Sequence, residues 1–146
     1  MVQRLGCELA GRLASVAPMH GQLAEGFNCA PAERLSIMNV WGTQDNTLPG
    51  DGSTSMDGWF YTSVADVRTL WAAAESQSCD SSTTSYTTVA DGTLEWSCVE
   101  HANCTSGATV VSCSWRGPHN WPSNMSTNFG MEAVWEFFQA NPREPL

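Results

Sequence analysis

Residues 35–42 read Leu-Ser-Ile-Met-Asn-Val-Trp-Gly, a nearly continuous apolar run of strand length. A strand with one solvent-facing side alternates apolar and polar residues, whereas a strand buried on both faces, as in a parallel sheet, does not. We therefore expect residues 35–42 to form an interior strand. The following segment, residues 43–59, is rich in Gly, Asp, Asn, Ser and Thr and is expected to be a loop.

Helix-like periodicity occurs on both sides of this strand. Apolar residues three or four apart predict an N-terminal helix that packs one face, formed by Val2, Leu5, Leu9 and Leu13, against the core. A second helix is predicted over residues 64–74, capped by Thr62 or Ser63, and a third over residues 131–138. Trp71 and Trp135, on these two helices, are expected to be core residues.

Further strands are predicted from short β-rich runs. Residues 15–18 and 109–115 each read as a strand, and residues 83–89 and 93–98 read as a hairpin closed by Ala90-Asp91-Gly92. Helices and strands thus alternate, which predicts the α/β class. At 146 residues, the chain is long enough for one domain and too short for two.

Composition limits the partners and the compartment. A net charge of −9 argues against binding to nucleic acid or to an anionic membrane surface, because both would repel the chain. Six cysteines and the absence of lysine favour an extracellular protein with up to three disulfides. Sequons at Asn103 and Asn124 support secretion only weakly. Charged residues interrupt the first segment, so a signal peptide is expected to lie outside this chain.

Two residues that can carry hydrolytic chemistry follow predicted strands. Asp45 lies three residues beyond the strand 35–42, and His119 lies four residues beyond the strand 109–115. In α/β sheets, functional residues lie on loops at the carboxyl ends of strands. Alone, Asp45 would be read as a turn residue and His119 as an exposed loop histidine. Together, in the chain order acid then histidine, they predict the acid and base of a hydrolase triad.

Three segments stand out: LGCELA and APMHG within residues 5–21, WGTQDNTLP at residues 41–49 and RGPHNWP at residues 116–122. They resemble the polyhydroxybutyrate depolymerase and feruloyl esterase family of α/β-hydrolases. Residues 41–49 (WGTQDNTLP) are similar to its HGTxDxxVP segment around the catalytic acid, and residues 116–122 (RGPHNWP) to its GGGHxWP segment around the catalytic histidine. Residues 5–21 resemble its LACEL…APVAG stretch, which follows the nucleophile elbow. The three matches span almost the whole chain. Trp41, in place of histidine, and Gly117-Pro118, in place of glycines, depart from the pattern.

The resemblance implies a partial α/β-hydrolase fold. Residues 1–146 would be the C-terminal portion of one domain, a mostly parallel sheet flanked by helices, with a β-hairpin insertion. His119 would be the general base and Asp45 its orienting acid, without a cofactor. The family's Gly-x-Ser-x-Gly elbow has no match here, so we expect the chain alone to be inactive. The implied substrates are esters, either feruloylated polysaccharide or polyhydroxyalkanoate.

Two other kinds of protein remain open alternatives. The first is a non-catalytic protein, a truncated or pseudoenzyme form that binds without turnover. The second is an extracellular disulfide-rich binding domain unrelated to hydrolases, which the paired motifs disfavour. The strand 35–41 is too apolar for a solvent-facing sheet edge, and this favours a fragment of a longer protein over a self-sufficient module.

The cysteines and tryptophans give further expectations. The resemblance implies a Cys7–Cys29 disulfide and leaves three pairings open for Cys79, Cys98, Cys104 and Cys113. A zinc site built from His101 and three of these cysteines is disfavoured against disulfides, so no metal is expected. Trp41 and Trp121, beside the two catalytic loops, either line an aromatic acyl pocket or only pack the loops. His101 is expected to be a loop residue, and His20 receives no role.

Overall fold

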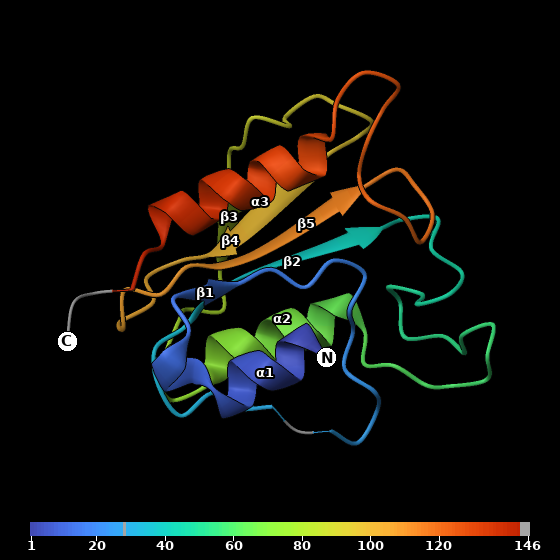
Figure 1. Ribbon diagram of the computed structural model, residues 1–146. Helices are drawn as coiled ribbons and strands as arrows, with labels where there is room; N and C mark the ends of the chain where they lie inside the picture. The colour runs from blue at the N-terminus through green and yellow to red at the C-terminus, as the bar shows by residue number, and fades with distance from the viewer. Residues whose placement is uncertain (28, 144–146) are drawn as a thin grey trace.

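The computed structural model describes residues 1–27 and 29–143, whose strands form one mixed five-stranded sheet in the order β1-β2-β5-β4-β3 (Figure 1). Three neighbouring strands are parallel, and the last two are antiparallel. The parallel strands are β1 (Ser15–Val16), β2 (Ser36–Gly42) and β5 (Val110–Trp115), and the antiparallel strands are β4 (Ser97–His101) and β3 (Thr83–Ser85). This arrangement confirms the α/β class.

The strand β2 is an interior strand, as its sequence predicts. It pairs with β1 on one side and with β5 on the other, from Ile37 opposite Val110 to Gly42 opposite Trp115. Successive residues serve opposite faces, so Met38 and Val40 join one hydrophobic cluster and Ile37 joins the other. The edge strands of the described sheet are the short strands β1 and β3, and β2 lies inside it.

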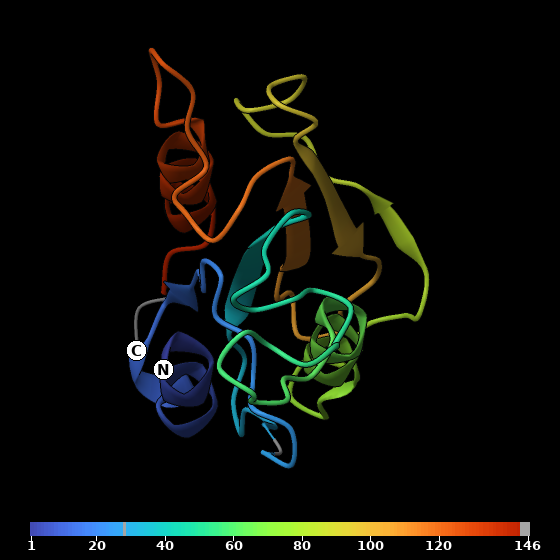
Figure 2. The ribbon, with the colours of Figure 1, turned by 90° about the vertical axis from the view of Figure 1, so that its right-hand side faces the viewer.

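Helices cover both faces of the sheet. The helices α1 (Val2–Glu8) and α2 (Val64–Ala73) lie on one face, and α3 (Phe129–Ala140) lies on the other (Figures 1 and 2). Ser63 is the N-cap of α2, and its side chain accepts a hydrogen bond from the backbone N–H of Asp66. Trp71 of α2 is fully buried, as expected.

The predicted core face of the N-terminal helix is wrong for Val2, Leu5 and Leu9, which are exposed. Leu13, the fourth predicted residue, is partly buried against the core, but it lies beyond α1. The helix instead turns Gln3 and Gly6 towards the core. Gly6 permits this packing because a Cβ atom there would lie 2.9 Å from the ring of Trp71. The Gln3 side chain then accepts a hydrogen bond of 3.0 Å from the indole N–H of Trp71. The inner face of α1 is therefore formed by the small Gly6 and by Gln3, whose amide is hydrogen-bonded, and the larger apolar side chains lie outside.

The predicted core role of Trp135 in α3 is also wrong. This side chain is 63% exposed, and Met131 and Phe138 on the same helix are exposed as well. The buried residues of α3 are its neighbours around the helix, Phe129, Gly130, Ala133, Val134 and Phe137. The helix thus has apolar residues on a wider arc than one sheet face can cover, and the sequence pattern does not choose among them.

The predicted hairpin exists, but its strands are shorter and shifted. Thr83 pairs with His101 and Ser85 pairs with Val99, so the paired strands begin and end elsewhere than residues 83–89 and 93–98. Asp91 and Gly92 lie within a long connection rather than a two-residue turn, and Leu94 and Glu95 have positive φ angles. His101 is buried at the end of β4, where Nδ1 lies 2.8 Å from the carbonyl oxygen of Asp80, and is not a loop residue.

All six cysteines are paired. The Cys7–Cys29 disulfide is confirmed, and the other bonds are Cys79–Cys104 and Cys98–Cys113. The last joins directly opposed residues of β4 and β5. The zinc alternative is excluded, because its cysteine ligands are consumed in disulfides. Among the described residues, no helix has the length and apolarity that crossing a membrane requires.

Candidate functional site

The loops after β2 and β5 meet at the carboxyl end of the sheet. The backbone N–H of Thr43 donates to Trp115, and that of Gln44 donates to Gly117, at 2.9 and 3.0 Å. Gly42 makes this contact possible, because a Cβ atom there would overlap the carbonyl group of Gly117. The two predicted site residues, one on each loop, are thereby brought together.

The buried Asp45 forms a hydrogen bond with the half-exposed His119. Oδ2 of Asp45 lies 2.8 Å from Nδ1 of His119, and the Asp45 side chain is only 2% exposed. The other carboxylate oxygen, Oδ1, accepts the backbone N–H groups of Thr47 and Leu48 at 2.9 and 2.8 Å. These backbone bonds fix the carboxylate from its own loop and leave Oδ2 for the imidazole.

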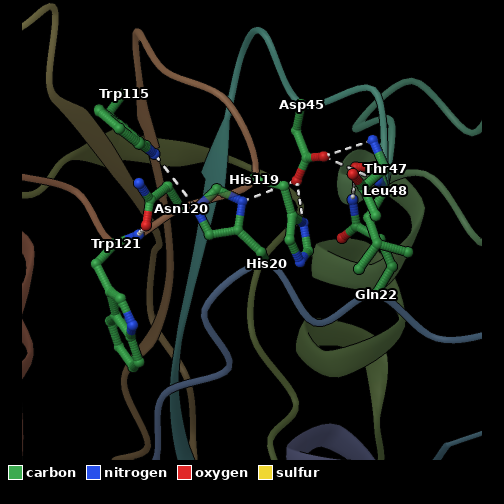
Figure 3. A network of polar contacts seen from close by, with 9 residues as sticks. All are labelled: His20, Gln22, Asp45, Thr47, Leu48, Trp115, His119, Asn120 and Trp121. Atoms are coloured by element: carbon green, nitrogen blue, oxygen red, sulfur yellow. Dashed lines mark hydrogen bonds and ion pairs between the residues drawn. The ribbon is translucent and has the colours of Figure 1, made fainter.

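A second histidine, which the sequence analysis left without a role, shares the same oxygen. Nδ1 of His20 also lies 2.8 Å from Oδ2 of Asp45, and the His20 ring lies beside that of His119 with centroids 5.1 Å apart (Figure 3). His20 directly follows the segment that extends β1, and its backbone N–H donates to Val40 at 2.8 Å. The site therefore draws one residue from each of the three parallel strands' carboxyl ends.

The two histidines differ at their second nitrogen. The indole N–H of Trp115 points to Nε2 of His20 at 3.4 Å, so that nitrogen is an acceptor and the ring proton of His20 is on Nδ1. Nε2 of His119 has no hydrogen-bond partner within residues 1–27 and 29–143. The His119 side chain is 39% exposed, against 5% for His20. Of the two, only His119 offers a free imidazole nitrogen to a reactant.

Burial would by itself raise the pKa of the Asp45 carboxyl. Hydrogen bonds from the Leu48 backbone and from both histidines, with the charge interaction with His119, outweigh it and hold that pKa below its ordinary value. Asp45 is therefore ionised at neutral pH. A charged, oriented carboxylate is what stabilises an imidazolium ion on His119.

The same three residues could be considered as metal ligands, because one donor atom from each lies within 4.8 Å of the others. Their protonation does not fit a metal. Because the indole N–H of Trp115 donates to Nε2 of His20, the ring proton of His20 is on Nδ1. A protonated Nδ1 has no lone pair with which to bind a metal ion. The carboxylate accepts four hydrogen bonds, which already use its approximately four lone-pair sites. The arrangement fits hydrogen-bonded positioning of His119 instead.

His119 opens onto a hollow of about 230 Å³. Its lining includes the exposed Trp121, together with Met19 and Asn120. Trp41 borders a different hollow of about 460 Å³, on the side of Asp45. The two tryptophans thus do not share one pocket, and only Trp121 lies where a group bound at His119 would touch it. Within the part of the chain that the structure describes, no serine, threonine or cysteine lines the His119 hollow.

The comparisons with known proteins add no relative. No protein-family model matches the chain, and no curated protein matches it. The likeness to an esterase family therefore depends on the quoted motifs, and the site must be judged from its own geometry.

Proposed function

We propose that this chain carries the acid and base of a serine carboxylic-ester hydrolase with an α/β-hydrolase fold. The observation that carries the proposal is the 2.8 Å bond between the buried Asp45 and Nδ1 of His119, with Nε2 of His119 left free. An imidazole oriented by a carboxylate on one side and open on the other is the general base of a triad. The order acid then histidine is that of this fold.

The two residues would act in sequence. Nε2 of His119 takes the proton of an attacking serine hydroxyl and later gives it to the leaving alcohol. Through both steps the proton on Nδ1 stays hydrogen-bonded to Asp45, whose charge stabilises the imidazolium. A water molecule, with His119 again as the base, would then attack the ester formed between the serine and the acyl group. This step would release the acid product and the free serine.

The serine would come from a segment outside this sequence. The hollow beside His119 is lined by no hydroxyl or thiol side chain of the described residues. The free edge of β1 lies between α1 and α3 (Figure 2), and both helices have exposed apolar residues, among them Leu5, Leu9 and Trp135. A preceding strand and helix with the elbow would cover an edge and apolar faces of this kind.

The substrate and the compartment follow from chemistry and resemblance. Trp121, 56% exposed at the rim of the His119 hollow, would contact the acyl group of the ester. An aromatic rim suits a feruloyl group, and a polyhydroxyalkanoate chain would also pack against it. Three disulfides agree with an oxidising, extracellular location.

The decisive experiment begins with the coding sequence upstream of Met1. We expect an in-frame Gly-x-Ser-x-Gly there, and we expect the extended protein to hydrolyse a p-nitrophenyl ester while the 146-residue chain does not. His119→Ala and Asp45→Asn in the extended protein should each abolish most of that turnover, whereas the control Glu75→Gln, at an exposed residue just after α2, should not. Absence of the serine motif, or turnover by the short chain that survives His119→Ala, would overturn the proposal.

One observation favours a second candidate, a non-catalytic binding protein. Among the described residues, no nucleophilic side chain lines the His119 hollow. A binding protein without turnover would also lack one. The two candidates separate in the same experiment. A stop codon directly upstream, with an ester that binds at the hollow without turnover, would support the binding protein.

A further inference from the structure

The buried His20 is held by more bonds than a packing residue needs. Its Nδ1 lies 2.8 Å from Oδ2 of Asp45, its Nε2 accepts from Trp115 and its backbone N–H donates to Val40. Each polar group of the residue that faces the interior therefore has a partner. A buried histidine with both ring nitrogens engaged is fixed in orientation and in tautomer.

The backbone of His20 has an unusual conformation. Its φ angle is +49°, in the left-handed region that residues other than glycine rarely adopt. Residues held in such conformations concentrate at functional sites, where the surrounding structure enforces them. The imidazole of this residue points at Asp45 (Figure 3).

We propose that His20 is a positioning residue: its Nδ1–H, kept on that nitrogen by Trp115, holds Asp45 turned towards His119. Apart from the two histidines, the bonds to the Asp45 carboxylate among the described residues are those to Oδ1 from the N–H groups of Thr47 and Leu48. Those two bonds alone leave Oδ2 able to rotate about the axis through Oδ1. The bond from His20 restricts this rotation and keeps Oδ2 within reach of His119.

The two histidines have different surroundings. The His20 ring is hydrogen-bonded to Asp45 and lies beside the ring of His119. A proton on Nε2 of His20 would face the indole N–H of Trp115, so the ring proton is placed on Nδ1. Nε2 of His119 has no such neighbour among the described residues, and the His119 side chain is 39% exposed. On one carboxylate, His20 is thus the fixed donor and His119 is the imidazole that is open to a reactant.

This inference rests on the proposed role of His119 as base, but its test needs no nucleophile or substrate. The sequence has three histidines, so the nitrogen resonances of the ¹⁵N-histidine-labelled chain can be assigned by substitution. We expect His20 to show a protonated Nδ1 and a bare Nε2, the tautomer that the indole N–H of Trp115 favours. A bare Nδ1, or a mixture of the two tautomers, would overturn the proposal.

A matched pair of variants then separates positioning from packing. Glycine and asparagine both tolerate a positive φ angle, but only asparagine has a donor, its side-chain NH₂, as many bonds from Cα as Nδ1 of histidine. In His20→Gly, we expect the ¹³C carboxyl titration of Asp45 to move to higher pH, because a donor to the ionised form is lost. In His20→Asn, we expect it to stay close to that of the parent chain.

Equal Asp45 titrations in the parent chain and both variants, or equal shifts in the two variants, would refute a positioning role. Amide spectra of each variant check that the fold persists. If His20→Gly does not fold, the tautomer of His20 in the parent chain and the Asp45 titration in His20→Asn still test the positioning role. Failure of the esterase assay alone would count against the proposed function and leave these nuclear magnetic resonance results standing.

Discussion

The helices α2 and α3 have similar apolar patterns but differ in how many of their large apolar residues are buried. In α2 the large residues Val64, Val67 and Trp71 face the sheet and are buried. In α3, Phe137 and its buried neighbours face the sheet, but Met131 and Trp135 are exposed. Helix α1 also exposes large apolar residues, Val2 and Leu5, and it buries Gly6.

This difference shows that the spacing of apolar residues identifies a helix but does not determine which of its sides is buried. A 3.6-residue period identifies a helix, but a helix with apolar residues on most of its circumference can rotate either arc inwards. In α1, close contact with Trp71 selects the arc with the smallest residue. The helices α1 and α3 lie on either side of the edge strand β1 (Figure 2), whereas α2 contacts β5, the middle strand of the sheet.

The largest effect is expected for Trp71→Ala, which tests the buried side of this comparison. The substitution removes a fully buried indole and leaves Gln3 without its donor. We expect the free energy of unfolding to fall by about 4 kcal/mol, by analogy with other buried aromatic truncations. Urea unfolding followed by circular dichroism measures it. A loss of under about 1 kcal/mol would show that α2 is not packed as described.

The next effect concerns the disulfide on the α3 side of the sheet. Replacement of both Cys98 and Cys113 by alanine opens a loop of 15 residues. We expect a loss of about 3 kcal/mol, the chain-entropy value for a loop of this length. Thermal unfolding of the variant and of the parent chain gives the difference. An unchanged midpoint would mean that β4 and β5 are held in register without the bond.

Asp45→Asn tests the site, which lies at the sheet end between the two helical layers. Loss of the charge in a hydrogen-bonded, buried group should cost about 2 kcal/mol at neutral pH. The folded-state pKa of Asp45 is lowered, so the stabilisation is complete above the unfolded value of about 3.9 and is lost as pH falls through the folded pKa. The gap between parent and variant should therefore narrow in acid.

Urea titrations at a series of pH values measure that gap. Glu75→Gln is the control, because Glu75 is an exposed carboxylate just after α2, away from the site. A gap that is constant down to the acid limit would show that Asp45 is not ionised in the folded chain.

The smallest effect is expected for Trp135→Ala, the exposed counterpart of Trp71→Ala. With 63% of the side chain exposed, we expect a change below about 0.5 kcal/mol in the dilute 146-residue chain. The same urea experiment measures it beside Trp71→Ala. A loss comparable to that of Trp71→Ala would mean that this face of α3 is covered in solution.

The sequence predicts the frame of the molecule and part of its site. The strand β2 follows from its unbroken apolar run, the cap Ser63 from its position before an apolar helix, and the proximity of Asp45 to His119 from strand ends that meet. The expected faces of α1 and α3 fail because their apolar residues exceed one face. The hairpin register fails because Asp-Gly marks a turn without fixing which residues pair.

His20 is the site residue that the sequence analysis missed, although a usable signal exists. The positional rule that selects Asp45 and His119 applies equally to the end of the strand predicted at residues 15–18. What the sequence does not contain is the indole N–H of Trp115 at Nε2, because that contact depends on how β5 sits against its neighbours. The different duties of the two histidines are therefore visible only in three dimensions.

The distances along the chain within the site have a consequence for folding. His20 and His119 lie 25 and 74 positions from Asp45, each at the end of a different parallel strand. Contacts of such long range form slowly, since the intervening chain must first be ordered. A slip of β5 by one residue would also exchange its two faces. His20, Asp45 and His119 thus come together only after the three parallel strands have paired in register. The Asp45–His119 bond is therefore expected to form late in folding and to report on correct strand pairing.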